Sequence, residues 1–247
     1  MKKLKLFLAV WTVGLFFGFV FRILKLTKRV EVFGYENLLK YFEEFAPKNK
    51  PLIVMPNHPS LWEPGLLPFL FFPQYLTSLR FVPFSLPDKK NFFDKNWFAP
   101  FRAVCVPIER GNRREELKTI FMLKDRFKEG GIYILFAEGG RTHLGKEFKI
   151  AIRSDNRIRK FPKGIERLFS GSCIVLPIWT KGGEKVIPSR KTFPRGPYFF
   201  YPRIWEKTKL CIGEPFQLPE NLSKGEIREF LEDKLLEVSE AFWRELI

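Results

Sequence analysis

The chain has 247 residues, and a hydrophobic share of 45% is ample for a folded core. Forty-three Lys and Arg against 27 Asp and Glu leave a net charge of +16, which predicts an anionic partner: nucleic acid, anionic lipid headgroups or a phosphorylated substrate. Three widely separated cysteines and two histidines argue against a zinc site and against a disulfide framework.

Residues 1–29 are predicted to form a membrane-anchoring helix. The segment Leu6–Phe21 holds 16 residues without a charge and is flanked by Lys and Arg on both sides. As a helix it would be about 24 Å long, shorter than the roughly 30 Å hydrocarbon core, but an extension to Leu26 would span if Arg22 and Lys25 snorkel. No small-residue cleavage site follows, so a retained helix that lies in the interface and one that spans the bilayer both fit.

From residue 30 onward, apolar runs alternate with helical patterns. We expect strands at Val30–Gly34, Leu52–Met55, Leu79–Val82, Ala103–Ile108, Ile132–Ala137 and Cys173–Ile178. We expect helices at Glu36–Phe45, Pro64–Phe72 and Arg114–Lys128, and a last amphipathic helix opened by a capping box of Ser223 and Glu226. This alternation predicts one α/β domain over residues 30–247, with a mixed or mostly parallel sheet flanked by helices and a site at the carboxyl ends of the strands.

The first candidate site follows the run Leu52–Met55, where Asn57-His58-Pro59-Ser60-Leu61-Trp62-Glu63 reads as a tight loop. In such a loop the Glu63 carboxylate can reach Nδ1 of His58 and leave Nε2 as a general base for a hydroxyl. We expect Ser60 to hydrogen-bond within the loop. A histidine at a strand end is also common as a purely structural residue.

The second candidate site follows Ile132–Ala137, where the chain continues as Glu138-Gly139-Gly140-Arg141-Thr142. Two glycines between a carboxylate and a guanidinium suit an anion-binding turn, and an ordinary glycine turn with a surface ion pair is the alternative. The basic residues of 145–160 fit a solvated loop, or one that rests on anionic headgroups or steers an acidic substrate. Residues 188–203, rich in Pro, Arg and aromatics, are a candidate second interfacial loop.

Four short motifs occur in one order along the chain: Asn57-His58 with Glu63, Val106-Pro107-Ile108-Glu109-Arg110, Phe136-Ala137-Glu138-Gly139-Gly140-Arg141, and Val175-Leu176-Pro177-Ile178. Together they resemble the phospholipid acyltransferase family that includes the 1-acyl-glycerol-3-phosphate acyltransferases. The chain departs from that pattern in three ways. Glu63 stands where the family has Asp, Ala137 and Gly140 replace its Pro and Thr, and the stretch Arg80–Phe84 lacks its lysine.

The resemblance implies a membrane-bound enzyme that moves a fatty acyl group from acyl-CoA or acyl carrier protein to lysophosphatidic acid, giving phosphatidic acid. It implies His58 as the base and Glu63 as its orienting partner, no metal and no further cofactor, and a place on the cytoplasmic face of the cell membrane. The acceptor-binding residues that it implies are Arg110, Glu138, Gly139, Arg141 and Thr142.

Three alternatives stay open. The acceptor could instead be glycerol 3-phosphate or another lysophospholipid. A hydrolase in which His58 activates water would need the same histidine loop. A basic nucleic-acid-binding protein would fit the charge and the aromatics, but the apolar N-terminus, which would tether the chain to a membrane, argues against a nucleic-acid partner.

Overall fold

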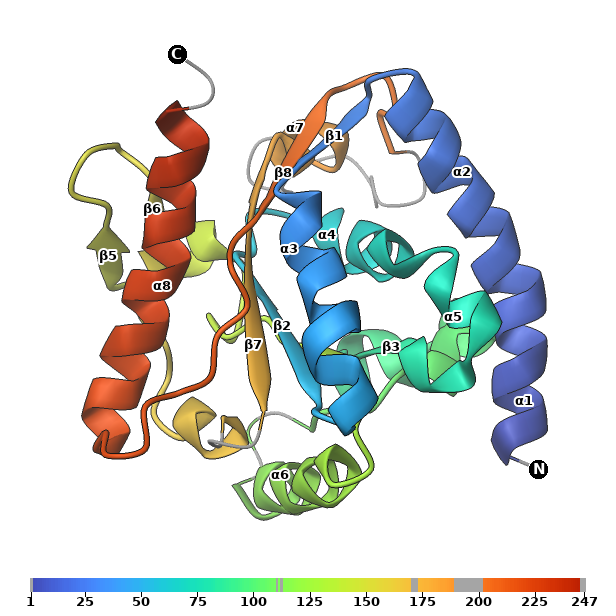
Figure 1. Ribbon diagram of the computed structural model, residues 1–247, viewed down its shortest axis with the longest axis horizontal. Helices are drawn as coiled ribbons and strands as arrows, with labels where there is room; N and C mark the ends of the chain where they lie inside the picture. Colours follow the sequence, from blue (N-terminus) through green and yellow to red (C-terminus); the bar gives the residue numbers. More distant parts are fainter. Residues whose placement is uncertain (1, 110, 112, 170–172, 189–201, 245–247) are drawn as a thin grey trace.

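The computed structural model has a six-stranded sheet at its centre, with helices packed on both faces (Figure 1). It describes residues 2–109, 111, 113–169, 173–188 and 202–244. The strand order is β1-β8-β7-β2-β4-β3, and every neighbouring pair is parallel except β7 and β8. The strands are β1 (Val30–Phe33), β2 (Leu52–Pro56), β3 (Pro83–Ser85), β4 (Ile132–Ile134), β7 (Ile174–Lys181) and β8 (Thr208–Ile212). The predicted α/β fold with a mixed, mostly parallel sheet is confirmed.

The centre of the sheet is β2, which lies between β7 and β4. Leu52 pairs with Ile174 on one side and with Ile132 on the other, and all of β2 is buried. Alternate residues face opposite sides: Leu52 and Val54 join one apolar cluster, while Ile53 and Met55 join the other. Because β2, β4 and β7 are parallel, their carboxyl ends meet at one edge of the sheet, where such folds place their sites.

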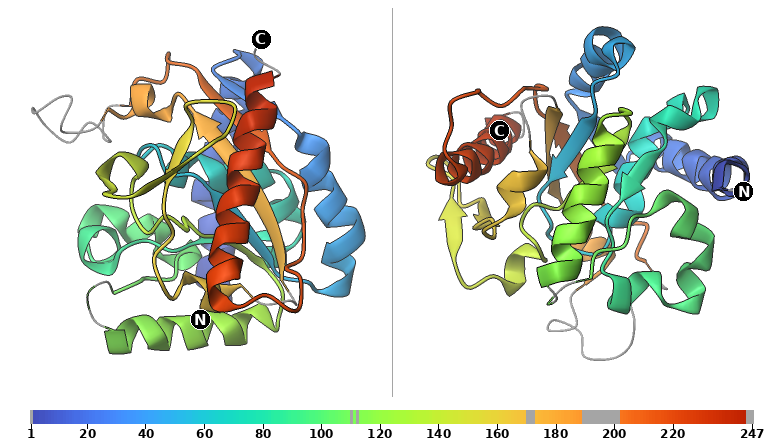
Figure 2. Two further views of the ribbon diagram at one scale, coloured as in Figure 1. Left: turned by 90° about the vertical axis from the view of Figure 1, so that its left-hand side faces the viewer. Right: turned by 90° about the horizontal axis from the view of Figure 1, so that it is seen from below.

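Helices cover the two faces unequally (Figures 1 and 2). One cluster is covered by α2 (Leu15–Leu26), α3 (Tyr35–Lys40), α4 (Glu63–Leu66) and α5 (Gln74–Thr77). The other is covered by α6 (Arg113–Phe127) and α8 (Lys224–Arg244). The predicted capping box begins α8: the Ser223 N–H donates to Glu226 Oε2 at 2.7 Å, and the Glu226 N–H reaches Ser223 Oγ at 3.4 Å. The short helix α7 (Gly183–Val186) follows β7.

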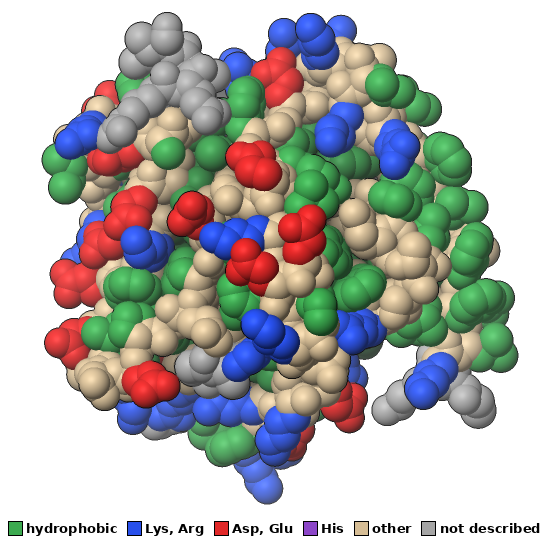
Figure 3. Space-filling view, in the orientation of Figure 1, with side chains coloured by type: hydrophobic (Ala, Val, Ile, Leu, Met, Phe, Trp, Pro, Cys, Tyr) green, Lys and Arg blue, Asp and Glu red, His purple; other side chains and the backbone are tan. Residues whose placement is uncertain are grey.

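The N-terminal helix runs through α1 (Lys2–Ala9), a π-helical turn (Val10–Gly14) and α2. It packs closely on the domain, because a Cβ at Gly18 would overlap the Phe72 ring and the Tyr75 hydroxyl donates to the Gly14 carbonyl at 2.7 Å. Lys3–Leu26 is the one helix in the described residues that is long and apolar enough to cross a membrane. Its outer face is apolar and exposed, along the right edge of Figure 3, and presents Leu4, Phe7, Leu8, Trp11, Phe16, Phe19, Ile23 and Leu26.

Two of the expected strands are wrong. Leu79–Phe81 is a 3-10 turn and the strand begins later, at Pro83. Residues 103–108 form no continuous strand, since a 3-10 helix occupies Asn96–Val104 and only isolated bridges follow, from Cys105 to Ser85 and from Ile108 to Asp88. Proline at 107 has no N–H for a ladder, which limits pairing to single bridges.

The expected helix over 64–72 is shorter than predicted, and three strands were missed. The α-helix α4 gives way to a 3-10 turn at Leu67–Phe71, which contains Pro68. The strand β8 lies next to β7, and a two-stranded antiparallel ribbon of β5 (Phe148–Ile150) and β6 (Arg157–Arg159) lies within the basic stretch predicted to be a loop. Charge concealed this ribbon, since three of its six residues are Lys or Arg and each strand is only three residues long.

Candidate active site

The histidine loop is fixed at its first residue by the end of β7. Asn57 is 3% exposed, and its side-chain amide donates to the Thr180 carbonyl at 3.0 Å. The Thr180 N–H and hydroxyl both donate to Asn57 Oδ1, at 2.6 and 2.9 Å. This bidentate clasp holds the carboxyl ends of β2 and β7 together, so the residue that follows, His58, has a fixed starting point.

His58 lies between the loop and the glycine turn. Its N–H donates to Glu138 Oε1 at 2.7 Å, and its carbonyl accepts from the Thr142 N–H at 2.8 Å. Its ring lies over Phe136 with 4.2 Å between centroids, and its Nδ1 is buried. The structure therefore brings together the two stretches, 80 residues apart in the chain, that the sequence singled out separately.

Glu138 joins three segments through one buried carboxylate. Besides the His58 N–H it accepts the Thr142 hydroxyl at 2.8 Å, and its Oε2 accepts the Arg159 N–H of β6 at 2.8 Å. Burial raises the pKa of this carboxyl, and the hydrogen bonds from Arg159, Thr142 and His58 oppose that rise. Direct contact with an acceptor stays a prediction for Glu138; its observed contacts fix the positions of the groups around it.

Glu63 is fully buried at the start of α4. Its Oε2 accepts the Ser60 N–H at 2.9 Å, and the Ser60 hydroxyl donates to the same carboxylate at 3.0 Å, so the expected hydrogen bonding of Ser60 within the loop is confirmed. Desolvation raises the pKa of Glu63 to about 7, against the opposing effect of its own backbone and of Ser60. The pairing of Glu63 with His58 stays a prediction.

The rest of the glycine turn has a conformation that would let its backbone come close to a bound anion. Gly139 has φ +67°, a left-handed conformation that favours glycine, and Arg141 is partly buried just before the 3-10 turn Thr142–Leu144. Arg110 lies outside the described residues, and so do residues 189–201 of the candidate second interfacial loop.

Three residues that shape the site were missed in the sequence. They are Thr180, which holds Asn57, Gly183, where a Cβ would overlap Glu63 Oε1, and Arg159, which donates to Glu138. The pair Gly182-Gly183 directly follows the apolar strand β7, so the sequence does carry a signal for it: a glycine pair at a strand end, like Gly139-Gly140. Arg159 carried none, because it lies within a run of basic residues.

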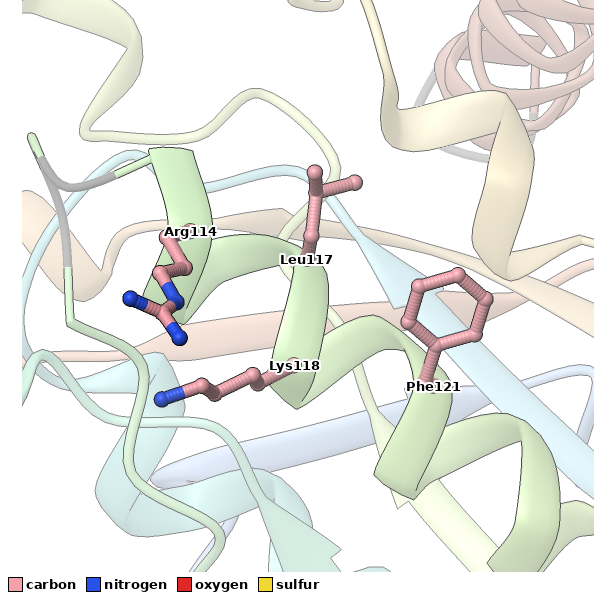
Figure 4. A pocket seen from close by; sticks show the side chains of 4 residues that line it. All are labelled: Arg114, Leu117, Lys118 and Phe121. Atoms are coloured by element: carbon pink, nitrogen blue, oxygen red, sulfur yellow. The ribbon is translucent and has the colours of Figure 1, made fainter.

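Away from this edge, the described residues offer little that resembles a second centre. They contain no group of three or more His, Cys, Asp or Glu side chains placed to hold a metal ion. A shallow depression on α6 is lined by Arg114, Leu117, Lys118 and Phe121, all from one helix face (Figure 4). None of these four belongs to the histidine loop or the glycine turn.

The histidine loop and the glycine turn are thus hydrogen-bonded to each other at the carboxyl edge of a mixed α/β sheet. Residues 29–181 match the family model described as Acyltransferase, and the chain belongs to that family. Among solved structures, the fold is similar to that of the 1-acyl-sn-glycerophosphate (LPA) acyltransferase PlsC from Thermotoga maritima. The two chains are 22% identical, the match covers 98% of each, and the TM-score is 0.50. No curated protein sequence matches the chain significantly.

Proposed function

We propose that the protein is a membrane-bound acyltransferase that esterifies the free hydroxyl of lysophosphatidic acid with a fatty acyl group from a thioester, giving phosphatidic acid. The observation that carries the proposal is the pair of hydrogen bonds that hold the His58 backbone between Glu138 and Thr142. They place a histidine beside a turn suited to an anion, which is the arrangement needed to deprotonate a hydroxyl on a phosphate-bearing acceptor.

In the proposed reaction His58 takes the proton of the acceptor hydroxyl. The oxygen attacks the thioester carbonyl carbon, the carbon–sulfur bond breaks, and the thiol leaves with the proton that His58 returns. Because Nδ1 of His58 is buried, Nε2 is the nitrogen proposed to face the hydroxyl. Glu63 is proposed to orient the ring. A thioester is already activated, so neither a covalent enzyme intermediate nor a metal or other cofactor is needed.

The acceptor phosphate is proposed to bind at the glycine turn. Arg141 supplies a guanidinium, Gly139 allows the backbone to approach closely, and Thr142 and Glu138 hold the turn in place. Arg110 is proposed to add a second cation on the basis of the sequence resemblance. The donor is acyl-CoA or acyl carrier protein.

Membrane association is proposed to occur through the exposed apolar face of the N-terminal helix, since both the acceptor and the product are lipids. Lys25, Lys28 and Arg29 near its carboxyl end would meet anionic headgroups, on the cytoplasmic face of the cell membrane. The name of the Thermotoga maritima structure favours lysophosphatidic acid over glycerol 3-phosphate as the acceptor.

The test is a mass-spectrometric assay of the purified full chain. Acyl-CoA and acyl carrier protein donors are each offered with lysophosphatidic acid, glycerol 3-phosphate or lysophosphatidylcholine, and His58→Ala is the matched control. We expect phosphatidic acid from the first acceptor and none from the variant. If ester forms only on glycerol 3-phosphate, the enzyme acylates that acceptor and not lysophosphatidic acid. Free fatty acid without loss of any acceptor would indicate a hydrolase.

A further inference from the structure

The ribbon β5–β6 packs against the glycine turn and delivers an arginine to it. Arg159 ends β6 opposite Phe148, and its N–H donates to Glu138 Oε2 at 2.8 Å. The backbone of Arg159 is thus fixed by the same carboxylate that fixes His58. Its side chain is only partly exposed, although it belongs to a strand flanked by surface loops.

The Arg159 side chain occupies the space that side chains on the turn would need. A Cβ at Gly140 would lie 2.9 Å from Arg159 Nη1, and a Cβ at Gly145 would lie 2.9 Å from Arg159 Cγ. The stem therefore lies along Gly145 and the guanidinium lies against Gly140. This bears on a departure noted in the sequence, since Gly140 stands where the resembling family has Thr, and a threonine there would displace the Arg159 guanidinium from its position.

Two kinds of hydrogen-bond donor, the Arg159 guanidinium and a backbone N–H, lie close together at Gly140. The guanidinium of Arg159 makes no ion pair in the part of the chain that the structure describes, although its charge is one of the effects that oppose the rise in the pKa of the nearby Glu138 carboxyl. The Gly140 N–H, next to it, makes no hydrogen bond to another described residue. A guanidinium beside a backbone N–H in a glycine turn is a combination that binds phosphate oxygens.

We propose that Arg159 is a phosphate-binding residue of the acceptor site and that Gly140 is glycine in this chain to admit its guanidinium. The inference rests on the proposed function, because it names a further residue for the same acceptor. The ligand chemistry is a phosphate monoester, whether on a lysolipid or on free glycerol 3-phosphate.

The experiment compares Arg159→Met with Arg157→Ala in the full chain. Methionine keeps an aliphatic stem for Gly145 but removes the charge, and the backbone bond to Glu138 remains. Arg157 lies on the same strand, is exposed, and has its guanidinium 4.7 Å from the Phe148 ring centroid, so its loss removes a positive charge from the ribbon but no contact with Gly140. We expect Arg159→Met to raise the KM for lysophosphatidic acid roughly 10- to 100-fold with donor KM unchanged, and Arg157→Ala to change neither.

A double-mutant cycle tests the role of Gly140. Gly140→Ala should raise acceptor KM when Arg159 is present and have little further effect in Arg159→Met, because the displaced guanidinium is then already absent. Equal effects of Gly140→Ala in both backgrounds, or an unchanged acceptor KM in Arg159→Met, would overturn the proposal.

A binding measurement separates this proposal from the proposed function. Calorimetric titration with sn-glycerol 3-phosphate needs no turnover and no membrane, and we expect Arg159→Met to weaken the Kd by a similar factor. If the unaltered protein binds this probe but acylates no acceptor, the proposed function fails while the Arg159 site stands. If binding is equal in the unaltered protein and Arg159→Met, or is absent from both, the Arg159 site fails.

Discussion

Glu63 and Glu138 are both buried carboxylates at the carboxyl edge of the sheet, yet their contacts differ. Glu138 accepts from three segments of the chain, whereas the observed hydrogen bonds of Glu63 come from Ser60 within its own loop. Each carboxylate accepts hydrogen bonds from a backbone N–H and from a hydroxyl group. These donors are buried and need an acceptor, which explains why neither position is apolar despite full burial. The chemistry proposed for His58 depends on these two supports.

The first prediction concerns His58 itself. If His58 is the general base, His58→Ala should lower turnover roughly 100- to 10,000-fold, because a positioned base contributes about that factor. Its folding should change little, since the bonds to Glu138 and Thr142 come from the His58 backbone and survive the substitution. Steady-state kinetics and thermal melting measure the two effects, and near-normal turnover would eliminate His58 as the base.

The second prediction concerns the pH dependence of stability at Glu63. Its pKa is about 7 in the folded protein against an ordinary value of 4.5, so between these pH values the unfolded chain loses a proton that the folded chain keeps. Stability that Glu63 contributes therefore falls as pH rises from about 4.5 to 7, by up to about 3 kcal/mol, and then levels off. Glu63→Gln lacks this titration.

Thermal melting of the unaltered protein and of Glu63→Gln at pH 5 and pH 8 isolates the contribution of Glu63, since the two proteins have all other buried carboxyls in common. The Tm of the unaltered protein relative to Glu63→Gln should be lower at pH 8 than at pH 5. A difference that is the same at both pH values would mean that Glu63 titrates normally in the folded state.

At the scale of elements, the apolar runs of the central strands were sufficient to predict β2, β4 and β7, because strands buried on both faces need no polar alternation. The edge strand β1 was predicted from the short run Val30–Gly34. The ends of these strands could also be predicted as sites, since His58 and Glu138 directly follow them. The clasp between Asn57 and Thr180 could not be predicted, because it depends on β7 lying beside β2. Neither could the ribbon β5–β6, because its contacts are with distant parts of the chain: Lys149 pairs with Asp233 of α8, and the Arg159 N–H donates to Glu138.

The third prediction concerns the turn between β7 and α7. Gly183→Ala should destabilise the protein by more than about 1 kcal/mol, because the new Cβ would overlap Glu63 Oε1 and lie 3.1 Å from Ser60 Oγ in a fully buried place. Gly65→Ala is the control: nothing lies within 4 Å of its Cβ, and alanine in a helix should be neutral or stabilising. Denaturant unfolding compares them, and equal midpoints would show that the turn can move away from Glu63.

At the scale of the whole molecule, the N-terminal helix forms an exposed apolar edge. The exposed apolar residues of the N-terminal helix lie along one edge, while Lys and Arg side chains gather around α6 at the lower end of the same view (Figure 3). The buried side of the helix packs into the apolar cluster that contains Leu52 and Val54, through Val10, Phe21 and Leu24. It is therefore packed on the domain along its length rather than joined to it by a flexible linker.

The fourth prediction concerns this edge. Replacing Phe16, Phe19 and Ile23 with serine should weaken binding to phosphatidylglycerol vesicles at least 10-fold, since three side chains that are 63%, 56% and 57% exposed would no longer enter the bilayer. The control is Phe121→Ser, which changes a side chain that is 64% exposed but belongs to α6 and not to the N-terminal helix. Vesicle co-sedimentation measures both, and equal binding by the triple variant would exclude this face as the membrane contact.

The shared acceptor Glu138 also determines how the site can fluctuate. The amide protons of His58 and Arg159 lie 101 residues apart in the chain but are held by the two oxygens of one carboxylate. A motion that withdraws that carboxylate exposes both amides in a single event, whereas a motion of either segment alone exposes only one. Correlated hydrogen–deuterium exchange at these two amides would therefore identify the site as one cooperative opening unit.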